Sequence, residues 1–122
     1  MELQLFGINY KTSNVSEREQ FIINESNQIL LDSFLKRKFK DKIDSFFGLS
    51  TCNRTEVYLV AEPGLAKDVL DETISFLGTK QIPSESFYFL FNQDALIHMC
   101  KVASGIDSQV LGEQEILGQF KK

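Results

Sequence analysis

A cysteine and an arginine two residues apart lie between two strand-like apolar runs, in the segment LSTCNRTE at positions 49–56. A loop held between two strands can expose a nucleophile and keep it in one place. The thiolate is the reactive form of cysteine, and the guanidinium of Arg54 stabilises it. A small apolar cysteine at a strand end is nevertheless more often packed than reactive. Cys52 is therefore a candidate nucleophile whose role depends on the rest of the chain.

The only histidine of the chain, His98, lies in the segment 95–102, whose apolar spacing predicts a helix. Residues two apart on a helix point about 200° apart, so His98 and Cys100 face different ways. Cys100 falls on the same side as Leu96 and Ala103, and we expect it in the core. A lone histidine on a helix is more often structural than catalytic, and the spacing alone leaves both roles open.

Three glycines alternate with short polar and acidic side chains in the segment 103–120. Glycine lets a backbone approach a ligand closely, and short polar side chains supply hydrogen-bond donors and acceptors. A glycine-punctuated connection into a C-terminal helix explains the same composition. The residues alone leave these two interpretations open.

The overall composition is that of a single globular domain. The chain has 122 residues, of which 43% are hydrophobic and 25% are charged, close to the average for a protein with its own core. The start lacks the pattern of a signal peptide, and no apolar run reaches the roughly 18 residues of a membrane span. We therefore expect a cytoplasmic protein without membrane contact, in which Cys52 and Cys100 are reduced.

The charge and the available ligand types argue against several classes of site. The net charge of −4 opposes a broad nucleic-acid-binding surface, which requires a basic field. One histidine and two distant cysteines do not make a three- or four-ligand metal site. No Gly-x-Gly-x-x-Gly follows a predicted strand, so we expect no cofactor-binding residue in this chain.

The hydrophobic periodicity predicts four strands and four helices that must position these residues. Ser16 with Glu19 fits a capping box at the start of the first helix, and Gly78 is a typical helix end. The predicted strands are 3–9, 43–51, 56–61 and 87–91, and the predicted helices begin at 16, cover 29–35 and span 65–77 and 95–102. An α+β fold accommodates this order most simply. We expect a ferredoxin-like antiparallel four-stranded sheet with helices packed on one face, plus a C-terminal loop-and-helix extension.

A basic run, KRKFKDK at positions 36–42, ends the second predicted helix. Cations near a helix C-terminus interact favourably with the helix dipole, which makes a solvated helix end the simpler interpretation. Contact with the phosphates of a nucleic acid is the alternative, and the sequence leaves it open.

Three motifs together carry a family resemblance. They are GINYKT at 7–12, STCNRTE at 50–56, and ASGIDS at 103–108 continued by GE at 112–113 and ILGQ at 116–119. In this order they resemble the N-terminal catalytic domain of glutamyl-tRNA reductase, and the match spans almost the whole chain. The chain departs from the family at Tyr10, where His is usual, at Asn14, where Pro is frequent, and at Gln114 and Glu115, where Pro-Gln is frequent.

The resemblance implies a reaction. Such enzymes reduce the activated carboxyl group of tRNA-bound glutamate to glutamate-1-semialdehyde with NADPH, as a first step of tetrapyrrole (porphyrin and haem) biosynthesis. A cysteine thiolate first exchanges the aminoacyl ester for a more electrophilic enzyme thioester, which hydride then reduces. The implied partners are glutamyl-tRNA, a second copy of the enzyme through a C-terminal domain absent from this chain, and a downstream aminotransferase. The NADPH domain is also absent, so we expect this chain to form the thioester and not to reduce it.

The resemblance also assigns roles to residues. The catalytic residues are Cys52 as the nucleophile and His98, for which proton transfer and ordering of the site both stay open. A guanidinium fork suits a free carboxylate, so Arg54 is expected to hold the side chain of glutamate. Either Glu113 or Glu115 is expected near the ammonium group of glutamate. The other substrate-contact positions of the family fall on Thr51, Asn53, Ser108, Gln114 and Gln119.

This interpretation divides the chain into a catalytic α+β core at 1–104 and a substrate-site loop at 105–122 that starts the helix toward the NADPH domain. Two other classes of function compete with it. A non-enzymatic RNA-binding module would need exposed aromatic residues interleaved with basic ones, which the strand around 46–49 lacks. A plain cysteine acyl hydrolase leaves the motif at 112–119 unexplained.

Overall fold

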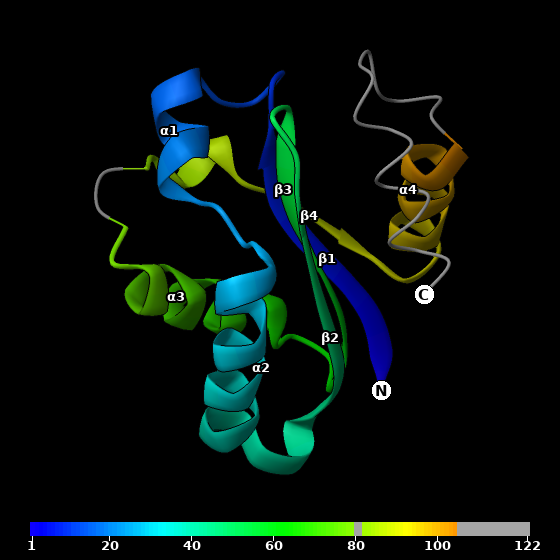
Figure 1. Cartoon of the computed structure of the whole chain (residues 1–122). Coiled ribbons are helices and arrows are strands. Elements are labelled where there is room, and N and C mark those ends of the chain that lie inside the picture. The colour runs from blue at the N-terminus through cyan, green and yellow to red at the C-terminus, as the bar shows by residue number, and fades with distance from the viewer. Residues whose placement is uncertain (80–81, 105–122) are drawn as a thin grey trace.

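The computed structural model describes residues 1–79 and 82–104, which form a four-stranded sheet with helices on both of its sides (Figure 1). The strands lie in the order β2-β3-β1-β4, and each neighbouring pair is antiparallel. The elements in chain order are β1 (Glu2–Asn9), α1 (Val15–Gln20), α2 (Glu25–Phe39), η1 (Lys40–Lys42), β2 (Ile43–Ser50), β3 (Arg54–Ala61), α3 (Ala66–Leu77), η2 (Ser84–Ser86), β4 (Tyr88–Phe91) and α4 (Asn92–Ser104). The predicted α+β class and the four antiparallel strands are confirmed.

Strands β1 and β3 form the centre of the sheet and alternate between two apolar faces. On β1, Phe6 belongs to one buried cluster and Leu5 to another. On β3, Val57 and Leu59 belong to the first cluster and Tyr58 to the second. Successive side chains of a strand point to opposite faces, so the two clusters lie on opposite sides of the sheet. Each apolar face needs its own cover.

Helices α1, α2 and α3 lie on the first face (Figure 1). Within this cluster, α2 buries Leu35 and α3 buries Val69. The start of α3 is tied to the sheet by the side chain of Gln4. Its Nε2 donates to the carbonyl of Glu62 at 2.7 Å, and its Oε1 accepts from the backbone N–H of Ala66 at 2.8 Å. This contact fixes the path of the chain where it leaves β3.

Helix α4 covers the second face, so the prediction that the helices pack on one face is wrong for α4 (Figure 1). Ala95 and Val102 are buried in the second cluster, and Met99 packs against it. Their spacing of four and three residues places them on one side of the helix. The other side carries Leu96, which is 51% exposed, and Cys100, which is also exposed. The expectation that Cys100 lies in the core is therefore wrong, because a different side of this helix packs against the sheet.

Several predicted element boundaries differ by one to four residues from those of the structure, and two of the differences bear on local structure. Helix α1 is capped by Asn14, whose Oδ1 accepts from the backbone N–H of Glu17 at 2.8 Å while the Glu17 carboxylate accepts from the Asn14 N–H. The capping box predicted at Ser16 and Glu19 is therefore two residues too late. Strand β3 begins at Arg54, two residues earlier than predicted. Arg54 consequently belongs to the sheet and not to the loop.

The predicted extension at 105–122 lies outside the described residues. Both cysteines, Cys52 and Cys100, are free thiols, as predicted. Across the described ranges, none of the helices combines the length and the apolar character that crossing a bilayer requires.

Candidate active site

Cys52 lies in the turn that joins β2 to β3, and backbone hydrogen bonds fix this turn on both sides. The N–H of Thr51 donates to the carbonyl of Arg54 at 2.8 Å, which closes the hairpin. The N–H of Asn53 donates to Oγ1 of Thr51 at 3.2 Å. The N–H of Tyr10 donates to the carbonyl of Asn53 at 2.8 Å, which joins the turn to the end of β1. The thiol of Cys52 is exposed, so a reactive group stands on a fixed backbone.

The side chain of Asn53 carries a buried donor next in sequence to Cys52. Its Nδ2 atom is shielded from solvent and makes no hydrogen bond to any other part of the chain that the structure describes. Burying a polar group without a partner costs free energy, and such groups in proteins call for an explanation. A ligand oxygen would satisfy this donor. The predicted substrate contact of Asn53 stays a prediction, and the buried donor is consistent with it.

Arg54 points into the interior of the domain. Its side chain is 1% exposed, and its Nη1 lies 3.6 Å from Oε2 of Glu56, whose side chain is 0% exposed. Two buried opposite charges compensate each other well only where further hydrogen bonds satisfy them. The guanidinium thus has an ionic partner within the domain, in addition to the substrate carboxylate predicted for it.

Glu56 is the centre of a buried hydrogen-bond network on the side of the sheet that faces α4. Its Oε1 accepts a hydrogen bond from the hydroxyl of Tyr58 at 2.5 Å. Its Oε2 accepts one from the hydroxyl of Tyr88, and Nε2 of His98 lies 2.6 Å from the same oxygen. The partners come from β3, β4 and α4, so folding assembles them from distant parts of the chain. We call Glu56, Tyr58, Tyr88 and His98 the Glu56 network.

The Glu56 network keeps one negative charge in the interior. Burial alone would raise the pKa of Glu56, but the hydrogen bond and charge of His98, together with the hydrogen bonds of Tyr58 and Tyr88, hold that pKa below its usual value. Burial, followed by the neighbouring carboxylate, raises the pKa of Tyr58 and of Tyr88 well above the usual value of 10.0. At neutral pH the carboxylate is therefore ionised and both tyrosines keep their protons.

Strand β3 connects the predicted catalytic residues, although neither of them belongs to it. Cys52 precedes β3, Arg54 begins it, and His98 reaches it through Glu56. The predicted contacts Thr51 and Asn53 lie in the turn beside the thiol. The remaining predicted contacts are outside the described residues: Ser108, Glu113, Gln114, Glu115 and Gln119.

Sequence reasoning assigned no role to Glu56, although it belongs to the cysteine motif. Arg54 and Glu56 occupy alternate positions of a strand whose other residues are mostly apolar, so they lie on the same face. A carboxylate inside such a strand needs buried partners. That pattern is the signal that could have found Glu56, whereas the identity of partners as distant as Tyr88 and His98 requires the fold.

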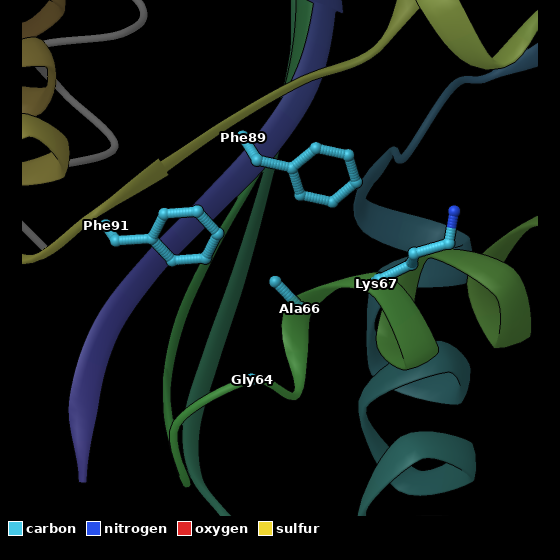
Figure 2. A pocket seen from close by; sticks show the side chains of 5 residues that line it. All are labelled: Gly64, Ala66, Lys67, Phe89 and Phe91. Atoms are coloured by element: carbon cyan, nitrogen blue, oxygen red, sulfur yellow. The ribbon is translucent and has the colours of Figure 1, made fainter.

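An apolar pocket of about 300 Å³ is a separate feature of the domain. It lies where the start of α3 meets β4 (Figure 2), and it is lined by Gly64, Ala66, Lys67, Phe89 and Phe91. Phe89 belongs to the first apolar face, opposite the face of the Glu56 network. No thiol, carboxylate or imidazole is among these lining residues, so we do not assign the chemistry to this pocket. Elsewhere in the described ranges, no three His, Cys, Asp or Glu residues are grouped to hold a metal ion.

Comparison with known proteins gives one consistent result. The family model described as Glutamyl-tRNAGlu reductase, N-terminal domain, matches residues 6–122. A glutamyl-tRNA reductase of Wigglesworthia glossinidia brevipalpis is 41% identical over 99% of this chain, and one of Actinobacillus succinogenes is 38% identical over 100%. In each case the chain spans 29% of the length of the relative.

A solved structure is also similar over nearly the whole chain. The glutamyl-tRNA reductase from Methanopyrus kandleri superimposes with a TM-score of 0.72 at 28% sequence identity. The similarity covers 98% of this chain and 26% of that one. The sequence and structure comparisons therefore agree, and both concern less than a third of the larger proteins.

Proposed function

This chain belongs to the glutamyl-tRNA reductase N-terminal domain family, and on that premise we propose that it is the thioester-forming domain of such an enzyme. The observation that carries the proposal is the free, exposed thiol of Cys52 on a fixed turn between β2 and β3, two residues before the buried Arg54. The proposed substrate is glutamyl-tRNA, and the proposed pathway is tetrapyrrole biosynthesis.

The proposed step converts the glutamyl ester of the tRNA into a thioester of the protein. The thiolate of Cys52 attacks the carbonyl carbon of the glutamyl ester, the new C–S bond forms, and the C–O bond to the terminal ribose of the tRNA breaks. We assign the proton to His98, which takes it from the thiol and returns it to the leaving ribose oxygen. The products are an S-glutamyl thioester on Cys52 and free tRNA.

Substrate recognition is assigned to residues that match the family positions. Arg54 pairs with the side-chain carboxylate of glutamate, because the α-carboxyl group is esterified and cannot serve. Asn53 supplies a buried donor without a protein partner in the described part of the chain. The other proposed contacts are Thr51 and, outside the described residues, Ser108, Glu113, Gln114, Glu115 and Gln119.

The described residues do not fit the cofactor of the family. Dinucleotides bind at a glycine-rich turn in a parallel βαβ unit, whereas every described strand pair here is antiparallel. We therefore propose that NADPH, which supplies hydride in this family, is held outside these residues. Dimerisation through another domain, an aminotransferase partner and a cytoplasmic location are proposals that rest on the family alone. The strand order β2-β3-β1-β4 supports the ferredoxin-like arrangement that we propose for the sheet.

The two competing functions are less well supported. A sheet that reads RNA bases needs an open face with exposed aromatic residues, and here helices lie against both faces of the sheet (Figure 1). A plain cysteine hydrolase accounts for Cys52 but would accept esters other than glutamyl-tRNA.

Acyl transfer to the protein tests the proposal. We expect the chain to become covalently labelled by tRNA charged with radioactive glutamate, and to release uncharged tRNA in equal amount. tRNA charged with glutamine is the matched control, because its side chain lacks the carboxylate. Equal labelling by both would favour an unspecific hydrolase, and tight binding without labelling would favour an RNA-binding module.

A further inference from the structure

We propose that Glu56 is a positioning residue for His98: its buried carboxylate holds the Nε2–H of the imidazole and leaves Nδ1 as the nitrogen that exchanges protons at the active site. The proposal rests on the proposed role of His98 in proton transfer. Glu56 belongs to the cysteine motif at 50–56, but the proposed reaction gives it no role.

Two contacts restrain the imidazole ring. Nε2 lies 2.6 Å from Oε2 of Glu56, and the ring centroid lies 5.9 Å from that of Tyr88, with the planes tilted by 56°. Tyr88 donates a hydrogen bond to the same carboxylate oxygen, so Glu56 and Tyr88, the two side chains that contact the ring, are also bonded to each other. The side chain of His98 is 15% exposed, which leaves limited access to the ring. The imidazole therefore has a set orientation in a mostly buried place.

The hydrogen bonds determine which nitrogen of His98 carries the proton. The hydroxyls of Tyr58 and Tyr88 both donate to Glu56, and an ionised carboxylate can only accept. Nε2 must therefore be the donor in its bond to Oε2. In a neutral imidazole the lone pair then lies on Nδ1. That nitrogen is the one able to take a proton from a thiol and return it to a leaving oxygen.

Gly7 makes the network geometrically possible. It pairs with Glu56 on one side of β1 and with Tyr88 on the other. A Cβ atom at Gly7 would lie 2.9 Å from Cγ of Glu56 and would also collide with the carbonyl oxygen of Thr55. The absent side chain lets Glu56 reach across the central strand to the hydroxyl of Tyr88. The sheet thus has an opening shaped for this carboxylate.

Stability alone does not account for a carboxylate in this place. A fully buried charge has lost its hydration, and buried ion pairs often contribute no more than well-packed apolar side chains of similar volume. A buried carboxylate that orients a histidine, by contrast, fixes its tautomer and stabilises the imidazolium that forms during proton transfer. Serine proteases use that arrangement in their catalytic triad, and the same physical reasoning applies to a histidine that serves a cysteine.

Nitrogen NMR of the imidazole tests the proposal without any assay of activity. His98 is the only histidine of the chain, so protein labelled with ¹⁵N-histidine gives one assignable pair of ring nitrogens. At a pH where the ring is neutral, we expect Nε2 to carry the proton and Nδ1 to be bare. A neutral ring with the proton on Nδ1 would overturn the proposal, whatever the rate of acyl transfer.

The rate of glutamyl transfer in a single turnover provides the second test. Glu56→Gln should lower the rate by about 10²-fold and mix the two tautomers, because an amide can also donate to the ring. Thr73→Val is the matched control, since it removes a buried 2.7 Å hydrogen bond to the Val69 carbonyl within α3. Equal rates for Glu56→Gln and the unmodified chain, or equal losses in both variants, would contradict the proposal. If the unmodified chain transfers nothing, the proposed function fails, while the NMR result still decides the placement of the proton.

Discussion

Arg54 shows how burial changes what a charged side chain can do. A guanidinium that is 1% exposed and lies 3.6 Å from Glu56 has exchanged water for a protein partner. Desolvation makes such a charge costly unless it is paired, and removing one member of a buried pair leaves the other uncompensated. Arg54 therefore has a structural role in the domain as well as the proposed contact with the substrate.

The two roles of Arg54 are separated by comparing charged and uncharged tRNA. Arg54→Ala should weaken the binding of glutamyl-tRNA by about 10- to 100-fold. The variant loses the hydrogen-bonded charge pair with the glutamate carboxylate, and such a pair contributes about 1.5–3 kcal/mol. The affinity for uncharged tRNA should not change, because it has no glutamate carboxylate. A binding titration with both forms measures this. Equal losses for both forms would mean that the role of Arg54 is only structural.

Tyr58 gives the domain a predictable sensitivity to alkali. Because the pKa of Tyr58 is raised in the folded protein, the folded state holds its proton at a pH where the unfolded chain has lost it. This contribution to stability is complete below pH 10 and declines above it, by about 1.4 kcal/mol per pH unit. Tyr58→Phe should flatten the fall in unfolding free energy between about pH 10 and pH 11.5, as measured by denaturant titration. An unchanged slope would contradict the buried, un-ionised state of this hydroxyl.

At the level of residues, the sequence predicted Cys52, Arg54 and His98 as the chemical groups and missed Glu56. The first three belong to motifs or are rare residue types in this chain. Glu56 acquires its meaning from Tyr88 and His98, which lie 32 and 42 residues away and meet it only in the folded sheet. Local patterns carry no information about such partners.

Among the elements, strand and helix positions were predictable, whereas the side of the sheet that α4 covers was not. The periodicity of α4 identifies it as a helix, but two of its sides carry apolar residues. The sheet uses the side with Ala95, Met99 and Val102 and leaves Leu96 exposed. This side of α4 is buried because the sheet has a second apolar face. That face forms only when β1 pairs with β3 and β4.

Ion pairs at the basic end of α2 favour one of its two interpretations. Lys36 pairs with Asp32 at 3.5 Å on the same helix, and Lys38 pairs with Glu72 of α3 at 3.5 Å. Exposed pairs of this kind contribute little stability, but they reduce the local positive charge. These contacts favour a solvated helix end over a phosphate-binding surface.

The salt dependence of tRNA binding tests this interpretation. Replacing Arg37, Lys40 and Lys42 together by Gln should leave the slope of log affinity against log salt unchanged. If these side chains touch phosphates, the slope should instead become shallower by about 0.7 to 0.9 for each lost contact. Affinity measurements over a series of salt concentrations distinguish the two outcomes.

In the whole molecule, the two faces of the sheet bury different kinds of side chain. One face of the sheet carries the main apolar cluster under α1, α2 and α3. The other face, under α4, carries the smaller cluster together with the Glu56 network, and Glu56 lies on β3, the strand that begins two residues after Cys52. The domain can therefore keep a large core on one side and place buried charges on the other.

The chain spans 29% of the length of the relatives it matches, so the complete reaction is a proposal that extends beyond it. The function proposed for this chain is therefore limited to the first step, the transfer of a glutamyl group to a thiol. That step requires Cys52, and not Cys100, to be the thiol that accepts the glutamyl group.

Mass spectrometry of the acylated protein tests that point most directly. After reaction with glutamyl-tRNA, we expect one glutamyl group on the peptide that contains Cys52, complete loss of labelling in Cys52→Ser, and normal labelling in Cys100→Ser. Cys100 is the matched control because it is also a free, exposed thiol, on the outer side of α4. Labelling of Cys52→Ser at the level of the unmodified chain would show that Cys52 is not the nucleophile.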